Sequence, residues 1–175
     1  MGPHAAWIVW VIVCGATAAA FFDIATRRIP NWLPAAILIA AVLYHAGHGA
    51  RDVLQALGAA GVVLVLGTLA HSRGWLGGGD VKLTAAVAAG LGFPATADFV
   101  LYALVSGGAL ALVAVVIAHR RALGPATRSF AMVFAGGALP RMPGGSLNVP
   151  YAVAIACGAA LTECATAIPL LRLFA

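Results

Sequence analysis

Residues 5–24 read AAWIVWVIVCGATAAAFFDI, a run in which Asp23 is the one charged side chain. About 20 apolar residues in an α-helix are enough to cross the ~30 Å hydrocarbon core of a bilayer. No Lys or Arg precedes this run, and Arg27 and Arg28 follow it closely. We therefore interpret it as a retained membrane helix rather than a cleaved signal peptide.

The composition extends this pattern to the whole chain. Of its 175 residues, 63% are hydrophobic and 9% are charged, whereas about 25% are charged in a typical soluble domain. The apolar runs are continuous and do not alternate, which favours helices over a barrel. The sequence predicts an all-α integral membrane protein with a single domain over residues 1–175. Six transmembrane helices are expected, over residues 5–24, 32–47, 53–71, 80–92, 97–118 and 149–170.

Basic residues give the expected orientation. The intervals after the first, third and fifth segments contain Arg27, Arg28, Arg73, Arg120, Arg121, Arg128 and Arg141. The other intervals contain only Arg51. Because short cytoplasmic loops are enriched in Lys and Arg, the three basic intervals are expected in the cytoplasm and both termini outside.

The longest connection, residues 119–148, mixes Arg with the apolar patch Phe130-Ala131-Met132-Val133-Phe134. This mixture suits a short helix on the cytoplasmic interface between the fifth and sixth helices, with a flexible loop as the alternative. The ten Lys and Arg residues form no dense block and are not interleaved with aromatic residues. Nucleic-acid binding is therefore not expected.

Five acidic residues are present, and two of them, Asp52 and Asp98, fall at the edges of predicted outer loops. Asp23, Asp80 and Glu163 fall within or at the ends of spans, where an ionisable residue is costly and indicates function. Asp23 ends the first segment and Asp80 begins the fourth. The expected topology thus places both at the same depth on the cytoplasmic face. We assign no role to Glu163.

A structural explanation is open for each of these two acids. Asp23 could pair with Arg27 four residues later, and Asp80 could interact with the N-terminus of its helix. A catalytic explanation covers both, because two carboxylates across a small gap repel and can hold one proton between them. The ionised acid then accepts a proton from water while the protonated acid donates to the peptide carbonyl. Glycines before the second acid leave room for an extended substrate backbone.

The motifs around the acids resemble a known family. Asp23 followed by Arg28-Ile29-Pro30-Asn31, together with Gly77-Gly78-Gly79-Asp80-Val81-Lys82-Leu83, is similar to the type IV prepilin peptidases, which are GxGD-type aspartyl proteases. The stretch from Val149 to Ile155, which opens the last helix, is also similar. The short chain resembles the small branch that serves tight-adherence (Flp) pili.

This resemblance implies cleavage of short basic leader peptides from type IV prepilins or pseudopilins at the cytoplasmic face of the bacterial inner membrane. It implies that Asp23 and Asp80 are the catalytic pair. The basic residues of this face are expected to bind anionic lipid headgroups. Larger members also N-methylate the mature pilin and carry a CxxC zinc arrangement. This chain begins directly at its first apolar segment and has no CxxC pair, so N-methyltransferase activity is not expected.

Further candidate residues have two interpretations each. Lys82 could tune the site from a neighbouring helix or reach to the interface as a snorkelling lysine. Asn31 could contact the site or shape the turn after Pro30. His45 and His48 have a spacing that suits a metal, but no third ligand is in view. We expect no metal and no other cofactor. Residues that could shape the site or bind substrate are Gly77, Gly78, Gly79, Lys82 and Asn31.

Two other functions remain open. One is a small proton-coupled carrier that uses Asp23, Asp80 and Glu163 as a relay. The single short span at residues 80–92 and the absence of a convincing internal repeat count against it. The other is a non-catalytic membrane subunit of a pilus-assembly machine.

Overall fold

The computed structural model describes residues 6–119 and 151–167, and within these ranges every regular element is a helix. The helices are α1 (Ala6–Thr26), α2 (Trp32–Ala46), α3 (Ala50–Ser72), α4 (Gly78–His119) and α6 (Tyr151–Ala167). The prediction of an all-helical protein is confirmed. The expected interfacial helix within residues 119–148 lies outside the described residues, apart from the last residue of α4.

Three of the described helices are long and apolar enough to cross a membrane: they contain the segments Trp7–Thr26, Ala50–Ser72 and Gly78–Val113. Two shorter apolar helices, Trp32–Ala46 and Tyr151–Cys164, accompany them. Large apolar side chains such as Trp10, Leu54 and Leu104 lie exposed on the outside of the bundle. An outer surface of this kind suits a protein whose helices face lipid rather than water.

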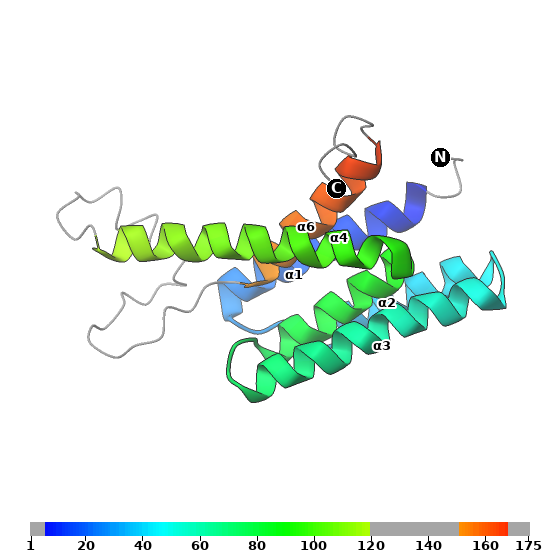
Figure 1. Ribbon diagram of the computed structural model, residues 1–175, viewed down its shortest axis with the longest axis horizontal. Coiled ribbons are helices and arrows are strands. Elements are labelled where there is room, and N and C mark those ends of the chain that lie inside the picture. The colour runs from blue at the N-terminus through cyan, green and yellow to red at the C-terminus, as the bar shows by residue number, and fades with distance from the viewer. Residues whose placement is uncertain (1–5, 120–150, 168–175) are drawn as a thin grey trace.

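Helix α4 spans both of the segments that the sequence predicted as separate helices, and it bends sharply between them at Gly92. Gly92 has φ 76° and ψ 172°, a conformation that glycine adopts readily and other residues avoid. The two expected segments, over residues 80–92 and 97–118, correspond to two helices that meet at Gly92, and residues 93–96 already belong to the second of them. The bend divides α4 into a first arm, residues 78–91, and a second arm, residues 93–119, which run in opposite directions (Figure 1).

His45 on α2 supports this bend. Pro94 has no amide hydrogen to donate to the carbonyl oxygen of Gly90, four residues earlier. The Nε2 atom of His45 lies 3.3 Å from that oxygen and supplies a hydrogen bond in its place. On the far side of the bend, the hydroxyl group of Thr96 donates to the carbonyl oxygen of Gly92 at 2.7 Å. Side chains therefore satisfy backbone groups that the bend releases.

The buried core joins α1, α2, both arms of α4 and α6. Its largest fully buried side chains include Ile12, Ile37, Leu83, Val87 and Phe99. Small residues bring α4 and α6 close together: a Cβ atom added at Gly158 would lie 2.8 Å from the backbone nitrogen of Ala103. The two backbones thus approach as closely as membrane helices do at small-residue contacts.

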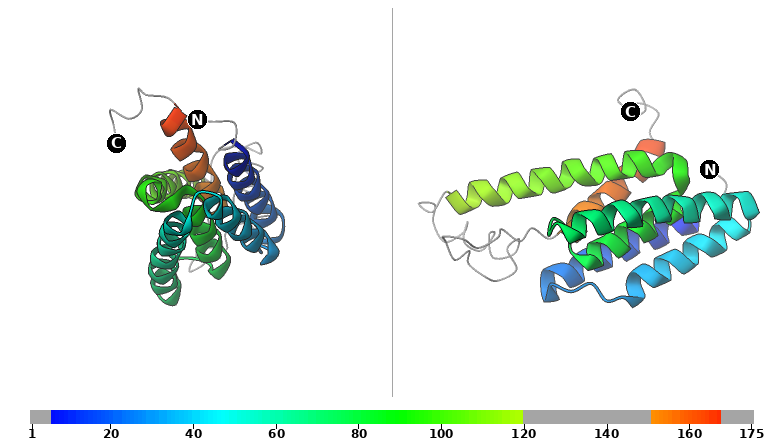
Figure 2. Two further views of the ribbon diagram at one scale, coloured as in Figure 1. Left: turned by 90° about the vertical axis from the view of Figure 1, so that its right-hand side faces the viewer. Right: turned by 60° about the horizontal axis from the view of Figure 1, so that its bottom comes forward.

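The course of the chain brings three connections to one end of the bundle. Successive segments run from one end to the other and back, with both arms of α4 counted separately (Figure 1). As a result, residues 27–31, residues 73–77 and the start of α6 lie at the same end, and the two further views agree (Figure 2). The end of α1, which carries Asp23, and the start of α4, which carries Asp80, meet there.

Candidate active site

Asp80 lies in the first turn of α4 and is the more deeply buried of the two acids. Only 9% of its surface is exposed. The backbone amide of Gly77 donates a hydrogen bond to its carboxylate. Its Oδ1 atom is buried and has no hydrogen-bond partner among the described residues. A buried carboxylate oxygen without a partner is costly, which is typical of a group kept for a substrate or a water molecule.

Asp23 lies on the last turn of α1 and is half-buried. The backbone amide of Ala152, at the start of α6, hydrogen-bonds to its carboxylate, and the charge of Arg27 attracts it. The attraction by Arg27 matches the structural explanation that the sequence offered for this acid. The bond from Ala152 adds α6 to the site, which the sequence did not predict, because any residue can supply a backbone amide.

The carboxylates of Asp23 and Asp80 lie near each other. Asp23 and Asp80 are close enough to repel each other electrostatically. The pair is assembled from three helices: α1 carries one acid, α4 carries the other, and α6 supplies the amide that binds the first. Burial and repulsion together disfavour two full negative charges at this place. A pair of this kind can hold one proton, so one carboxyl group can donate while the other accepts.

The three glycines before Asp80 have different surroundings. A Cβ atom added at Gly77 would lie 2.8 Å from Oδ2 of Asp80, and one added at Gly79 would lie 3.2 Å from Cβ of Ile29. One added at Gly78 would meet only His71, at an ordinary 3.7 Å. The space beside Gly77 therefore holds the carboxylate of Asp80 itself. The space beside Gly79 holds the turn after α1.

Lys82 and Asn31 contact each other. The Nζ atom of Lys82 donates a hydrogen bond of 3.0 Å to Oδ1 of Asn31, across 51 positions of sequence. Asn31 precedes the first residue of α2, but its side chain makes no capping hydrogen bond there. Sequence reasoning selected each residue separately and missed their mutual contact. Lys82, two positions after Asp80, bonds to the turn after α1.

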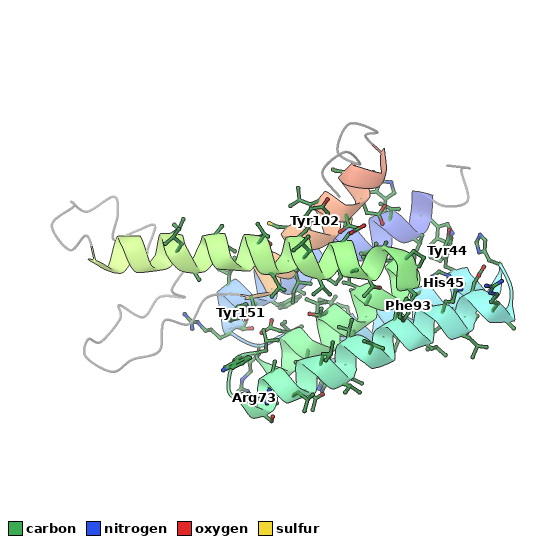
Figure 3. All side chains as sticks on the ribbon, in the orientation of Figure 1. Tyr44, His45, Arg73, Phe93, Tyr102 and Tyr151 are labelled. Atoms are coloured by element: carbon green, nitrogen blue, oxygen red, sulfur yellow. The ribbon has the colours of Figure 1, made fainter. Side chains whose placement is uncertain are left out.

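Other candidate residues lie apart from the pair. Glu163 is half-buried on α6, 11 positions beyond Ala152, which corresponds to about 16 Å along a helix. His45 and His48 lie on and just after α2, and His45 lies near Phe93 and the bend of α4, far from Arg73 and Tyr151 (Figure 3). Within residues 6–119 and 151–167, no three His, Cys, Asp or Glu side chains gather as metal ligands would.

An apolar cleft of about 450 Å³ adjoins the site. It lies between α3, both arms of α4 and α6. Val81 and Thr84, which follow Asp80 by one and four positions, form part of its wall. Tyr151, next to the Ala152 amide, forms another part (Figure 3). The cleft is thus lined by residues that are next in sequence to Asp80 and to Ala152, and neither carboxylate forms part of its wall.

One comparison with known proteins gives a match. The sequence model of the type IV leader peptidase family matches residues 10–112. The matched range covers more than half of the chain and includes both carboxylates, the glycines, Asn31 and Lys82. No curated protein and no solved structure matches the chain.

Proposed function

The chain belongs to the type IV leader peptidase family, and from this membership we propose that it is an intramembrane aspartyl endopeptidase. Its substrates are type IV prepilins or pseudopilins, from which it removes the leader peptide. The family match and the apolar helices together indicate a multi-pass membrane protein that belongs to a family of proteases. The aspartyl mechanism rests on one observation: two carboxylates on different helices lie within repelling distance, and one of them is buried.

In the proposed mechanism, Asp23 and Asp80 share one proton. The ionised carboxylate accepts a proton from a water molecule as the water attacks the scissile carbonyl carbon. The protonated carboxyl group donates a hydrogen bond and then its proton to the carbonyl oxygen, giving a tetrahedral diol. Collapse of the diol breaks the C–N bond: the leaving nitrogen takes up a proton from the protonated carboxyl group, and one diol hydroxyl gives its proton to the other carboxylate, which restores the shared proton. The unpartnered Oδ1 of Asp80 leaves one lone-pair site for the water or the substrate.

The proposal includes a topology. Six membrane spans, with the two arms of α4 counted separately, place both termini outside and the acids at the cytoplasmic face of the bacterial inner membrane. The gathering of residues 27–31, residues 73–77 and the start of α6 at one end supports it. Arg27, Arg28 and Arg73 then lie where anionic lipid headgroups are found. We assign the chain to the small Flp-type branch on its motifs.

Cleavage without N-methylation is a further part of the proposal. The three cysteines, Cys14, Cys157 and Cys164, lie on α1 and α6 and form no CxxC pair. The glycines before Asp80, with Lys82 and Asn31, shape the site. Incubation of the protein and a prepilin with a methyl donor, followed by mass spectrometry of the product, is expected to show an unmethylated new N-terminus.

The decisive experiment uses purified protein in vesicles and a prepilin with a basic leader. Asp23→Asn and Asp80→Asn are each expected to abolish cleavage, whereas the control Asp98→Asn, at an exposed residue on the second arm of α4, is expected to leave it unchanged. Thermal unfolding checks that each variant folds. Cleavage that persists in either of the first two variants refutes the catalytic pair. A wild-type protein that cleaves no prepilin instead favours a carrier or a non-catalytic assembly subunit.

A further inference from the structure

We propose that the turn formed by Ile29, Pro30 and Asn31 is a positioning element that sets the placement of the two carboxylates. It does so by binding the start of α4 at two points, Gly79 and Lys82. The inference rests on the proposed function, because it assigns this turn a role in the same catalytic site. It explains why a lysine two positions from Asp80 and an asparagine 51 positions away in the sequence belong to one site.

The turn is closely tied to the end of α1 that carries Asp23. The amide of Arg27 still donates to the carbonyl oxygen of Asp23, at 2.9 Å. Arg27 itself has φ 55°, which ends the helix and redirects the chain. The hydroxyl group of Thr26 then bonds to the carbonyl oxygens of Phe22 and Arg28, at 2.9 and 3.1 Å. These short-range bonds connect the end of α1 directly to the turn.

The turn holds the start of α4 by one apolar and one polar contact. Ile29 packs against Gly79 so closely that an added Cβ atom would lie 3.2 Å from that of Ile29. Lys82 donates to Asn31 at 3.0 Å. Gly79 and Lys82 are three positions apart, so they lie on one face of the helix. Two contacts on one face fix both the distance of the turn from α4 and its register along α4.

The same contact determines where the lysine charge lies. Residues two positions apart on an α-helix point about 200° apart, so Lys82 and Asp80 leave α4 in different directions. Asn31 is a neutral acceptor and binds the ammonium group on the side of the turn. An ammonium group directly beside the acid pair would favour two ionised carboxylates, whereas the proposed chemistry requires one shared proton. The turn thus keeps the cation away from the pair.

The test compares kinetic constants of the full chain in vesicles. Lys82→Met and Asn31→Leu are each expected to lower kcat about tenfold, the effect of about 1.4 kcal/mol from one charge-assisted hydrogen bond. KM is expected to stay constant, because a positioning role requires no contact between these two residues and the substrate. The double variant is expected to lose about tenfold as well, since both changes remove one contact. Lys82→Arg and Asn31→Asp, which keep a donor and an acceptor, are expected to restore most of kcat.

Two controls separate positioning from a general effect. Arg51→Met removes an exposed charge at the opposite end of the bundle and is expected to change neither constant. Spin labels at Ala25 and Trp75, in a background without the three native cysteines, report the spacing between the end of α1 and the loop before α4. Their distance distribution is expected to be narrow in the parent protein and broader in Lys82→Met. This measurement requires no proteolytic activity.

The outcomes distinguish the two proposals. A protein that cleaves no prepilin but whose label distances broaden in Lys82→Met refutes the proposed function and supports the positioning role of the turn. A protein that cleaves, but whose kcat and label distances are unaffected by Lys82→Met, refutes the positioning role alone. A rise in KM without a fall in kcat also overturns it, because Lys82 would then bind substrate. So does a hundredfold loss in the double variant, which would mean that the two residues act independently.

Discussion

The three glycines before Asp80 give a prediction that separates two explanations of the same motif. In Gly77→Ala, the new methyl group would lie 2.8 Å from Oδ2 of Asp80. Carbon and oxygen atoms that are not bonded do not approach so closely, so the carboxylate must shift away. A misplacement of about 1 Å at a catalytic group can cost about a hundredfold in rate. We expect kcat of Gly77→Ala to fall between tenfold and a hundredfold.

The neighbouring glycines supply the matched comparison. Gly78→Ala meets only His71 at 3.7 Å and is expected to retain kcat within about twofold. Because alanine favours a helix more than glycine does, the unfolding free energy of Gly78→Ala is expected to rise by up to about 1 kcal/mol. The kcat of Gly79→Ala is expected to lie between those of Gly77→Ala and Gly78→Ala. Its methyl group would lie 3.2 Å from Ile29, which must shift by a few tenths of an ångström.

The assay is prepilin cleavage under initial-rate conditions, with thermal unfolding measured on the same samples. Gly77→Ala is expected to unfold within a few degrees of wild type, because the displaced group is the flexible end of a side chain. An equal loss of activity in Gly78→Ala and Gly77→Ala would refute this explanation. In that case the glycines serve the approach of the substrate backbone, as the sequence alone suggested, and the position of the Asp80 carboxylate is not the reason for Gly77.

Two further predictions concern the scaffold. His45→Ala leaves the carbonyl oxygen of Gly90 without its side-chain partner and is expected to lower the unfolding free energy by about 1–3 kcal/mol. His48→Ala is the control, because the ring of His48 bonds to the nearby carbonyl oxygen of Tyr44 on the same side of the molecule. Its unfolding free energy is expected to stay within about 0.5 kcal/mol of wild type. Equal stabilities of these two variants would contradict the role of His45 at the bend. Gly158→Ala places a methyl group 2.8 Å from the backbone of Ala103, which cannot move aside as a side chain can. This variant is expected to lower the unfolding free energy by about 1–3 kcal/mol. Gly58→Ala, whose methyl group would face open space, is its control in the same unfolding measurement.

The sequence could predict where the two acids meet because the relevant signals are local. Apolar runs locate helices, and Arg27, Arg28 and Arg73 mark alternate connections. Short connections force neighbouring helices to reverse, so the end of the first helix and the start of the fourth must share one end of the bundle. Asp23 and Asp80 occupy these two places, and the structure brings them within repelling distance.

The sequence placed the division of α4 correctly, since the expected fourth segment ends at residue 92, but it could not show which residues support the bend. Residues 93–96 contain Phe93 and Pro94, and a proline commonly marks a break between helices. Here the reversal occurs at Gly92, and Pro94 lies two positions into the second arm, where its fixed φ suits the first turn of a helix. The carbonyl group of Gly90, in the last turn of the first arm, is satisfied by His45, from a different helix. A sequence pattern records no such long-range partner.

The same limit explains why the polar residues of the site were harder to interpret than the acids. A lysine near an aspartate in a sequence suggests an ion pair, and an asparagine before a helix suggests a cap. Neither local interaction forms: Asn31 caps nothing, and Lys82 bonds to Asn31. Each residue is available to the other because it is not used locally. Since a shared proton requires that no cation neutralise the pair, a partner that holds the Lys82 ammonium group on the side of the turn favours this chemistry.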